Sequence, residues 1–70
     1  MKITYDPEAD AAYIKFNQDG VKVTTIRVNN DVLIDIGHEK ELIGIEILNA
    51  TKNMGLVKGL KVELENLQAI

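Results

Sequence analysis

Residues 32–48, VLIDIGHEKELIGIEIL, carry the clearest structural pattern of this sequence. Apolar residues alternate with other residues on both sides of the polar segment 38–41, and a period of two is typical of β-strands joined by a turn. The same alternation extends back to Met1 and keeps its phase through four turns. The pattern predicts one antiparallel sheet with a strongly apolar face.

Polar turns divide residues 1–50 into five predicted strands. Asp, Asn, Gly and Pro favour turn conformations, and they gather at residues 6–10, 18–20, 29–31 and 38–41. The first three strands are predicted over residues 2–5, 11–16 and 22–28, and two more flank the last turn. Each strand is expected to pair with the next one along the chain, which makes a meander.

The predicted register separates two faces. It pairs Ile3 with Ile14, Ile14 with Thr24, Ile26 with Ile34, and Ile34 with Ile45. The isoleucine face, which is expected to form the core, then receives Met1, Ile3, Tyr5, Ala12, Ile14, Phe16, Ile26, Val28, Val32, Ile34, Ile36, Ile43, Ile45 and Ile47. The mixed face receives Lys2, Thr4, Tyr13, Lys15, Val21, Val23, Thr25, Arg27, Leu33, Asp35, Leu42, Gly44, Glu46 and Leu48.

The last part of the chain, residues 51–70, is predicted to form a short helix followed by a sixth strand. Asn49 or Thr51 is expected to cap the helix. Apolar and charged residues alternate over 60–65, but Leu60, Leu64 and Leu67 also fit a helical stripe, so both alternatives stay open. The predicted fold class is α+β, mainly β: a single domain with a five- or six-stranded antiparallel meander sheet and one short C-terminal helix.

Composition excludes several classes of function. The 70 residues include no Cys, so thiol catalysis and thiolate metal sites are excluded and a reducing, cytoplasmic location is expected. The net charge of −3 and the scattered basic residues disfavour nucleic-acid binding. The sequence has no apolar run of membrane-spanning length. A chain this small is at the limit of forming a stable core alone, so a homodimer or a bound partner is expected.

Three turn carboxylates are weak candidates for a metal site. Asp6, Glu8 and Asp10 have the spacing that opens a calcium-binding loop, but the sixth and twelfth positions are Ala11 and Asn17 instead of Gly and Glu. The favoured interpretation is a turn in which the Asp6 carboxylate binds its own backbone.

Candidates for catalysis are weaker still. The only histidine, His38, falls in a polar turn and is expected to be exposed, and the chain contains neither Ser nor Cys as a nucleophile. No catalytic residue, cofactor or nucleotide site is predicted.

The mixed face is the predicted site of partner binding. Its candidate contacts are Tyr13, Arg27, Leu33, Asp35 and Glu46, because an aromatic ring, leucine and arginine together resemble interface composition. The register also predicts that Arg27 forms ion pairs with Asp35 and Glu46.

Three segments resemble a small prokaryotic family called domain of unknown function 2283. They are MKITYDPEADAAYI at residues 1–14, NDVLIDI at 30–36 and LIGIEILNA at 42–50. The family shares the M-K-[IV]-x-Y-D-x-E-x-D start and the G-I-E-I-L-x-A ending. The chain departs from the family at Ala12, where Leu is expected, and at Gly37 and His38, where an acidic turn is commoner.

The resemblance implies no established activity. Members of the family are sometimes encoded beside a small toxin-like protein, which implies an antitoxin-like role toward a small basic partner. The leading hypothesis is therefore a non-enzymatic interaction module. The alternatives are a metal-binding protein or small enzyme that uses Asp6, Glu8, Asp10 and Glu46, and a structural subunit of a homo-oligomer.

Overall fold

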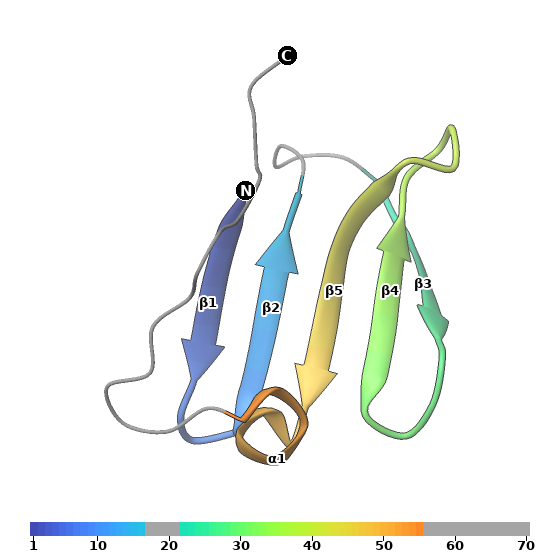
Figure 1. Cartoon of the computed structure of the whole chain (residues 1–70). Coiled ribbons are helices and arrows are strands. Elements are labelled where there is room, and N and C mark those ends of the chain that lie inside the picture. The colour runs from blue at the N-terminus through green and yellow to red at the C-terminus, as the bar shows by residue number, and fades with distance from the viewer. Residues whose placement is uncertain (17–21, 56–70) are drawn as a thin grey trace.

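The computed structural model describes residues 1–16 and 22–55. It contains an open, single-layer antiparallel sheet and a short helix at one end of that sheet (Figure 1). The elements are β1 Lys2–Asp6, β2 Ala11–Lys15, β3 Thr24–Arg27, β4 Val32–Ile36, β5 Leu42–Leu48 and α1 Ala50–Met54. The predicted fold class, α+β and mainly β with five antiparallel strands and a short helix, is confirmed.

The strand order corrects the meander prediction. The observed order is β1-β2-β5-β4-β3, so β5 lies between β2 and β4, and β2 does not pair with β3. Ile14 therefore pairs with Ile45 and not with Thr24. The physical reason is that a central strand is covered on both edges, which favours the long apolar strand β5 over the short polar strand β3.

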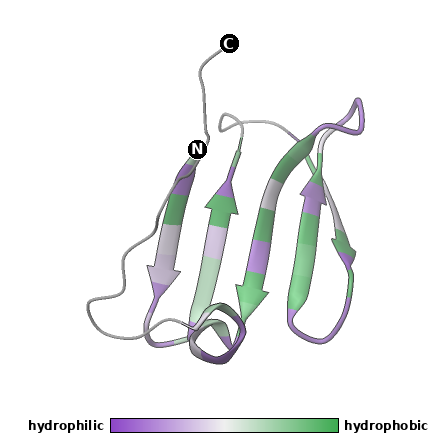
Figure 2. Ribbon diagram, in the orientation of Figure 1, coloured by the Kyte–Doolittle hydropathy of each residue, from purple (hydrophilic) through white to green (hydrophobic). Residues whose placement is uncertain are grey.

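The other three predicted pairings are confirmed. Ile3 pairs with Ile14, Ile26 with Ile34, and Ile34 with Ile45. Together with the Ile14–Ile45 pair, they form an unbroken row across all five strands. The phase of the alternation survives the change in strand order except at Leu42, which is predicted on the mixed face but pairs with Ile36 of the isoleucine face, and the hydrophobic colours concentrate in the strands (Figure 2).

The β4–β5 pairing contains one irregularity. Asp35 pairs with Gly44 but Ile36 pairs with Leu42, which shifts the register by one residue between them. Ile43, the residue left over, is buried, and its carbonyl accepts a hydrogen bond of 2.7 Å from the Phe16 amide.

Two of the predicted turns close as expected. The Val28 amide donates to the Val32 carbonyl over 2.8 Å and closes the loop 29–31. The Gly37 amide donates to the Glu41 carbonyl over 2.8 Å at the turn that contains His38. The predicted turn at 18–20 and the predicted sixth strand at 60–65 lie outside the described residues.

Helix α1 begins after Asn49, which is one of the two predicted cap residues. The Asn49 side chain, however, makes no capping hydrogen bond. The Asp10 carboxylate replaces it and accepts hydrogen bonds from the Thr51 amide, 3.1 Å, and the Thr51 hydroxyl, 2.7 Å. A carboxylate at a helix N-terminus satisfies amides that lack a partner within the helix. A distant turn, and not a local residue, therefore caps α1.

The isoleucine face is not enclosed by a second layer of described residues. Across residues 1–16 and 22–55, the buried hydrophobic side chains are Ala12, Ile43 and Ala50. Ile3 and Ile26, at the two ends of the isoleucine row, are 40% and 47% exposed. The expected core face is thus half-open. No helix in the described part of the chain is long and apolar enough to cross a membrane.

Candidate functional site

The mixed face is built from two adjacent cross-strand rows. One row runs through Thr4, Tyr13, Glu46, Leu33 and Arg27. The next row runs through Lys2, Lys15, Gly44, Asp35 and Thr25. The insertion of β5 between β2 and β4 therefore brings all five predicted partner contacts onto one continuous surface.

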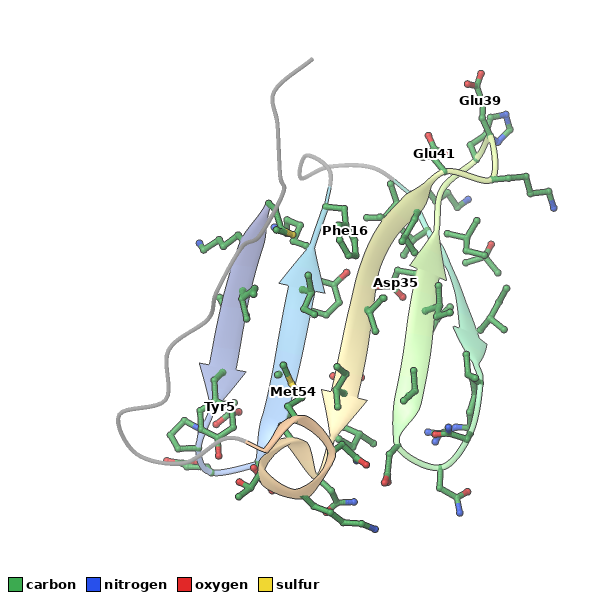
Figure 3. The ribbon with its side chains drawn as sticks, viewed as in Figure 1. Tyr5, Phe16, Asp35, Glu39, Glu41 and Met54 are labelled. Carbon is green, nitrogen blue, oxygen red and sulfur yellow. The ribbon has the colours of Figure 1, made fainter. Side chains whose placement is uncertain are left out.

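The centre of this surface is a hydrogen-bonded triad. The Tyr13 hydroxyl donates to Oδ2 of Asp35 over 2.7 Å, and the Thr25 hydroxyl donates to Oδ1 of the same carboxylate over 2.6 Å. These side chains come from β2, β4 and β3, and Figure 3 labels Asp35 on β4 beside β5. Both carboxylate oxygens thus have a partner, and the Tyr13 ring is held in one orientation.

Gly44 makes the Tyr13–Asp35 bond geometrically feasible. A Cβ atom placed on Gly44 would overlap the Tyr13 hydroxyl and its ring carbon Cζ, and it would lie 3.0 Å from the Ile14 carbonyl oxygen. The missing side chain leaves a gap on β5 through which the phenol reaches from β2 to β4. Glycine inside a strand often marks such a close approach.

The Tyr13 phenol is held in its protonated form. Its pKa is raised from 10.0 to about 12, first because the hydroxyl donates to Asp35, then because it is partly buried and because Asp35 and Glu46 are negatively charged. A phenol that keeps its proton acts as a donor and as an apolar surface, and it is not suited to act as a base near neutral pH.

Arg27 does not form the predicted ion pairs with Asp35 and Glu46. Its Nη1 donates to the carbonyl oxygens of Asn29, 3.2 Å, and Asn30, 3.0 Å. An exposed ion pair is worth only about 0–1 kcal/mol, so two nearby carbonyls compete well for the guanidinium. Arg27 therefore holds the 29–31 loop at the edge of the mixed face.

Leu33 and Glu46 complete the site. They form a cross-strand pair on β4 and β5, and both are half-buried. Leu33 offers an apolar contact beside Glu46, and Tyr13 flanks Glu46 on the other side. The mixed face therefore places one aromatic ring, one leucine and two carboxylates on three adjacent strands, β2, β5 and β4.

The acidic turn forms no metal site among the described residues. Oδ1 of Asp6 accepts hydrogen bonds from the backbone amides of Glu8, 3.0 Å, and Ala9, 3.4 Å, as the turn interpretation predicts. Asp10 is occupied by α1 and by the Tyr5 hydroxyl, 2.8 Å. Within the described ranges, no three His, Cys, Asp or Glu side chains converge as metal ligands would.

His38 is exposed in its turn, as predicted. Together with Lys22 and Lys40 it lines a hollow of about 360 Å³ that lies beside Ile26 and Ile36. This hollow therefore borders the isoleucine face and is not part of the mixed face.

Two carboxylates that anchor α1 were not predicted in this role. Asp31 accepts hydrogen bonds from the side-chain amides of Asn49, 3.0 Å, and Asn53, 2.9 Å. The pKa of Asp31 is lowered, first by the bond from Asn53, and the pKa of Asp10 is lowered, first by the bond from the Thr51 hydroxyl. The partners are 18 to 41 residues apart in sequence, so no local pattern reveals them.

Comparisons with known proteins identify a family but not an activity. No curated protein and no solved structure matches the chain. A family model described as "Protein of unknown function (DUF2283)" matches residues 2–50, which include all five strands and every residue of the mixed-face site. The chain therefore belongs to the DUF2283 family.

Proposed function

We propose that this protein is a non-enzymatic interaction module that binds a small partner protein through the mixed face. The observation that carries the proposal is the Tyr13–Asp35–Thr25 triad, which fixes an aromatic ring on a partly exposed sheet surface, in the same cross-strand row as Leu33 and separated from it by Glu46. Tyrosine anchors with apolar neighbours are typical of the residues that dominate binding energy at interfaces.

The triad supports binding because it orders the surface before a partner arrives. A side chain that must be immobilised on association costs about 0.5–1.5 kcal/mol. Tyr13 is already held by a charge-assisted hydrogen bond, and Arg27 is held by two carbonyls. The candidate contacts in this proposal are Tyr13, Arg27, Leu33, Asp35 and Glu46.

Charge supports a small basic protein as the partner. The chain as a whole carries a net charge of −3, and on the mixed face the carboxylates of Asp35 and Glu46 lie among the basic side chains of Lys2, Lys15 and Arg27. Complementary charge speeds the encounter of two proteins. Neutralisation of a basic toxin-like protein, an antitoxin-like role, is consistent with this charge. The proposal also includes a homodimeric working form and, from the absence of Cys, a cytoplasmic location.

The alternatives from the sequence receive less support. The carboxylates of Asp6 and Asp10 are already used, one within its turn and the other as the cap of α1. A structural subunit would also use the triad, because it links β2, β4 and β3, so only the partly exposed Tyr13 ring and Leu33 favour partner recognition over this alternative.

A matched pair of charge reversals tests the proposal. Glu46→Lys reverses a charge at the centre of the mixed face, and Glu39→Lys makes the same change in the exposed 38–41 turn. The tagged full-length protein and both variants are used for affinity capture from the source cell, and co-purified proteins are quantified by mass spectrometry.

The proposal predicts one small basic protein that is captured by the wild type and by Glu39→Lys. Its recovery falls at least about tenfold with Glu46→Lys, which corresponds to about 1.4 kcal/mol. Equal recovery with both variants, or recovery of no specific partner, would contradict the proposed function. Circular dichroism confirms that both variants keep the sheet.

A further inference from the structure

Within residues 1–16 and 22–55, the cross-strand rows of the isoleucine face contain no charged side chain. The central row consists of Ile3, Ile14, Ile45, Ile34 and Ile26, and the row beside it contains Tyr5, Ala12, Ile47 and Val32. On the other side of the central row, Thr24 pairs with Ile36. Charges on edge strands are a common protection against association, and this face lacks that protection at both edges.

The exposed apolar area of this face is in the upper part of the range seen on monomers, and it approaches but does not reach what a standard interface buries per partner. Its six most open side chains leave roughly 500 Å² uncovered, and half-buried isoleucines add to this area. These six are Met1, Ile3, Tyr5, Phe16, Ile26 and Val28. Standard interfaces bury about 800 Å² per partner, whereas the largest apolar patch on a monomer is typically about 300–600 Å².

We propose that a second copy of this chain covers the isoleucine face, so that two sheets pack face to face in a two-fold symmetric sandwich. An uncharged apolar face is self-complementary, because no like charges oppose each other across the symmetry axis. Two such sheets pack about 10 Å apart with their strands nearly aligned. The dimer thereby supplies the second layer that the described part of the chain lacks.

Helix α1 determines how the two copies are oriented. Tyr5, on the isoleucine face, and Thr51, on α1, donate to the same oxygen of Asp10, so α1 stands at the Tyr5 end of this face. Met54 projects from α1 over the sheet between β2 and β5 (Figure 3). A helix is about 10 Å wide, which matches the gap between packed sheets. The two helices fit only at opposite ends of the sandwich.

This reversed orientation also brings unlike charges together. Lys22, His38 and Lys40 line the hollow beside Ile26 at one end of the strands. Asp31 lies at the other end of β4, before Val32. When the second copy runs in the opposite direction, the hollow of one copy lies near Asp31 of the other.

The sandwich leaves both mixed faces on the outside, pointing in opposite directions. Given the proposed function, on which this consequence rests, the dimer carries two equivalent partner sites and forms a 2:2 complex. The face-to-face dimer deepens the homodimeric part of the proposed function, and it can be tested without a partner, so its failure can be distinguished from a failure of partner binding.

Two neighbouring substitutions on β1 provide the test. Ile3→Lys places a charge on the isoleucine face, and Thr4→Lys places the same charge on the mixed face, where Thr4 is exposed. Ile26→Lys repeats the first change at the opposite edge of the sheet. Light scattering over a range of concentrations gives the mass of the full-length wild type and of each variant.

The expected masses are twice 7.8 kDa for the wild type and Thr4→Lys, with a dimer dissociation constant raised at least about tenfold in Ile3→Lys and Ile26→Lys. A wild type that stays monomeric would overturn the proposal, since the face would then be covered by the chain's own residues or by another protein. A dimer that resists both isoleucine substitutions would overturn it as well.

A measurement on the wild type alone guards against variants that do not fold. Asp31 and Lys40 lie beyond opposite ends of β4, whose five residues span about 17 Å, so a zero-length carbodiimide cross-link between them must join two copies. Mass spectrometry is expected to detect this link at concentrations where the dimer forms. The reversed orientation would be overturned if the cross-links between two copies joined only residues from the same end of the strands.

Discussion

The Tyr13 hydroxyl on β2 bonds the Asp35 carboxylate on β4 over 2.7 Å, although β5 lies between the two strands. The bond crosses the sheet above Gly44, and it joins residues that are 22 positions apart in sequence. One side-chain contact thus links the N-terminal hairpin to β4 and also sets the centre of the mixed face.

The ionisation of Tyr13 is expected to report this bond directly. In Tyr5→Phe, Tyr13 is the only phenol, and ultraviolet titration should give a pKa of about 12. Asp35→Asn in the same background should lower this pKa toward 10, because a negatively charged acceptor is lost. Asp31→Asn, a matched change outside the mixed face, should leave the value at about 12.

The same shift predicts a loss of stability in alkali. Because the folded pKa is raised, the stabilisation is fully present below the unfolded value near 10 and is lost as the pH rises through about 12. Denaturant unfolding at increasing pH should show this loss in Tyr5→Phe and not in Tyr5→Phe/Tyr13→Phe. A similar loss in both proteins would mean that Tyr13 is not responsible.

Gly44→Ala is expected to act through Tyr13. The new methyl group would force the phenol away from Asp35, and we expect a loss of about 1–3 kcal/mol in the free energy of unfolding, as for a broken hydrogen bond to a charged group. In a Tyr13→Ala background the overlap with the phenol is absent and only the 3.0 Å approach to the Ile14 carbonyl oxygen remains, so the same substitution should cost less. Additive effects in this double-mutant cycle would contradict the close approach.

The two carboxylates that anchor α1 predict that the stability of the folded protein decreases at low pH. Both Asp10 and Asp31 have pKa values lowered from 3.8, so their contribution is fully present above that value and is lost as the pH falls through the folded pKa. Thr51→Val removes the hydroxyl that has the largest effect on Asp10, and it should reduce the acid sensitivity of stability. Thr4→Val, on an exposed part of β1, is the control and should not change it.

The alternation of residues 1–48 predicted the two faces and three of the four register pairs, because a one-residue slip would reverse every side chain of a strand. Strand order was harder to predict. A polar segment between two strands indicates a turn but does not require that the two strands pair, and the burial of β5 on both edges decides the order.

The residues of the candidate site were predicted better than their contacts. The five residues do share one face, but the Tyr13–Asp35 bond depends on the position of β5, and the role of Gly44 depends on that bond. Arg27 illustrates a local effect, because it binds carbonyls two and three residues away in the sequence and not the predicted carboxylates on β4 and β5. The Asp10 cap of α1 spans 41 residues and has no sequence signal.

The two proposals together give the two faces of the sheet separate roles, one in self-association and one in partner recognition. Leu33 and Ile34 are neighbours on β4 whose side chains lie on opposite faces, which makes their methyl groups a matched pair of probes. Methyl NMR spectra can follow both residues during dilution of the protein and during addition of the captured partner.

We expect the Ile34 methyl resonances to change on dilution, as the dimer dissociates, and the Leu33 methyl resonances to change when the partner is added. Separate roles for the two faces would be contradicted if the partner shifted Ile34 and left Leu33 unchanged, or if dilution changed Leu33 alone.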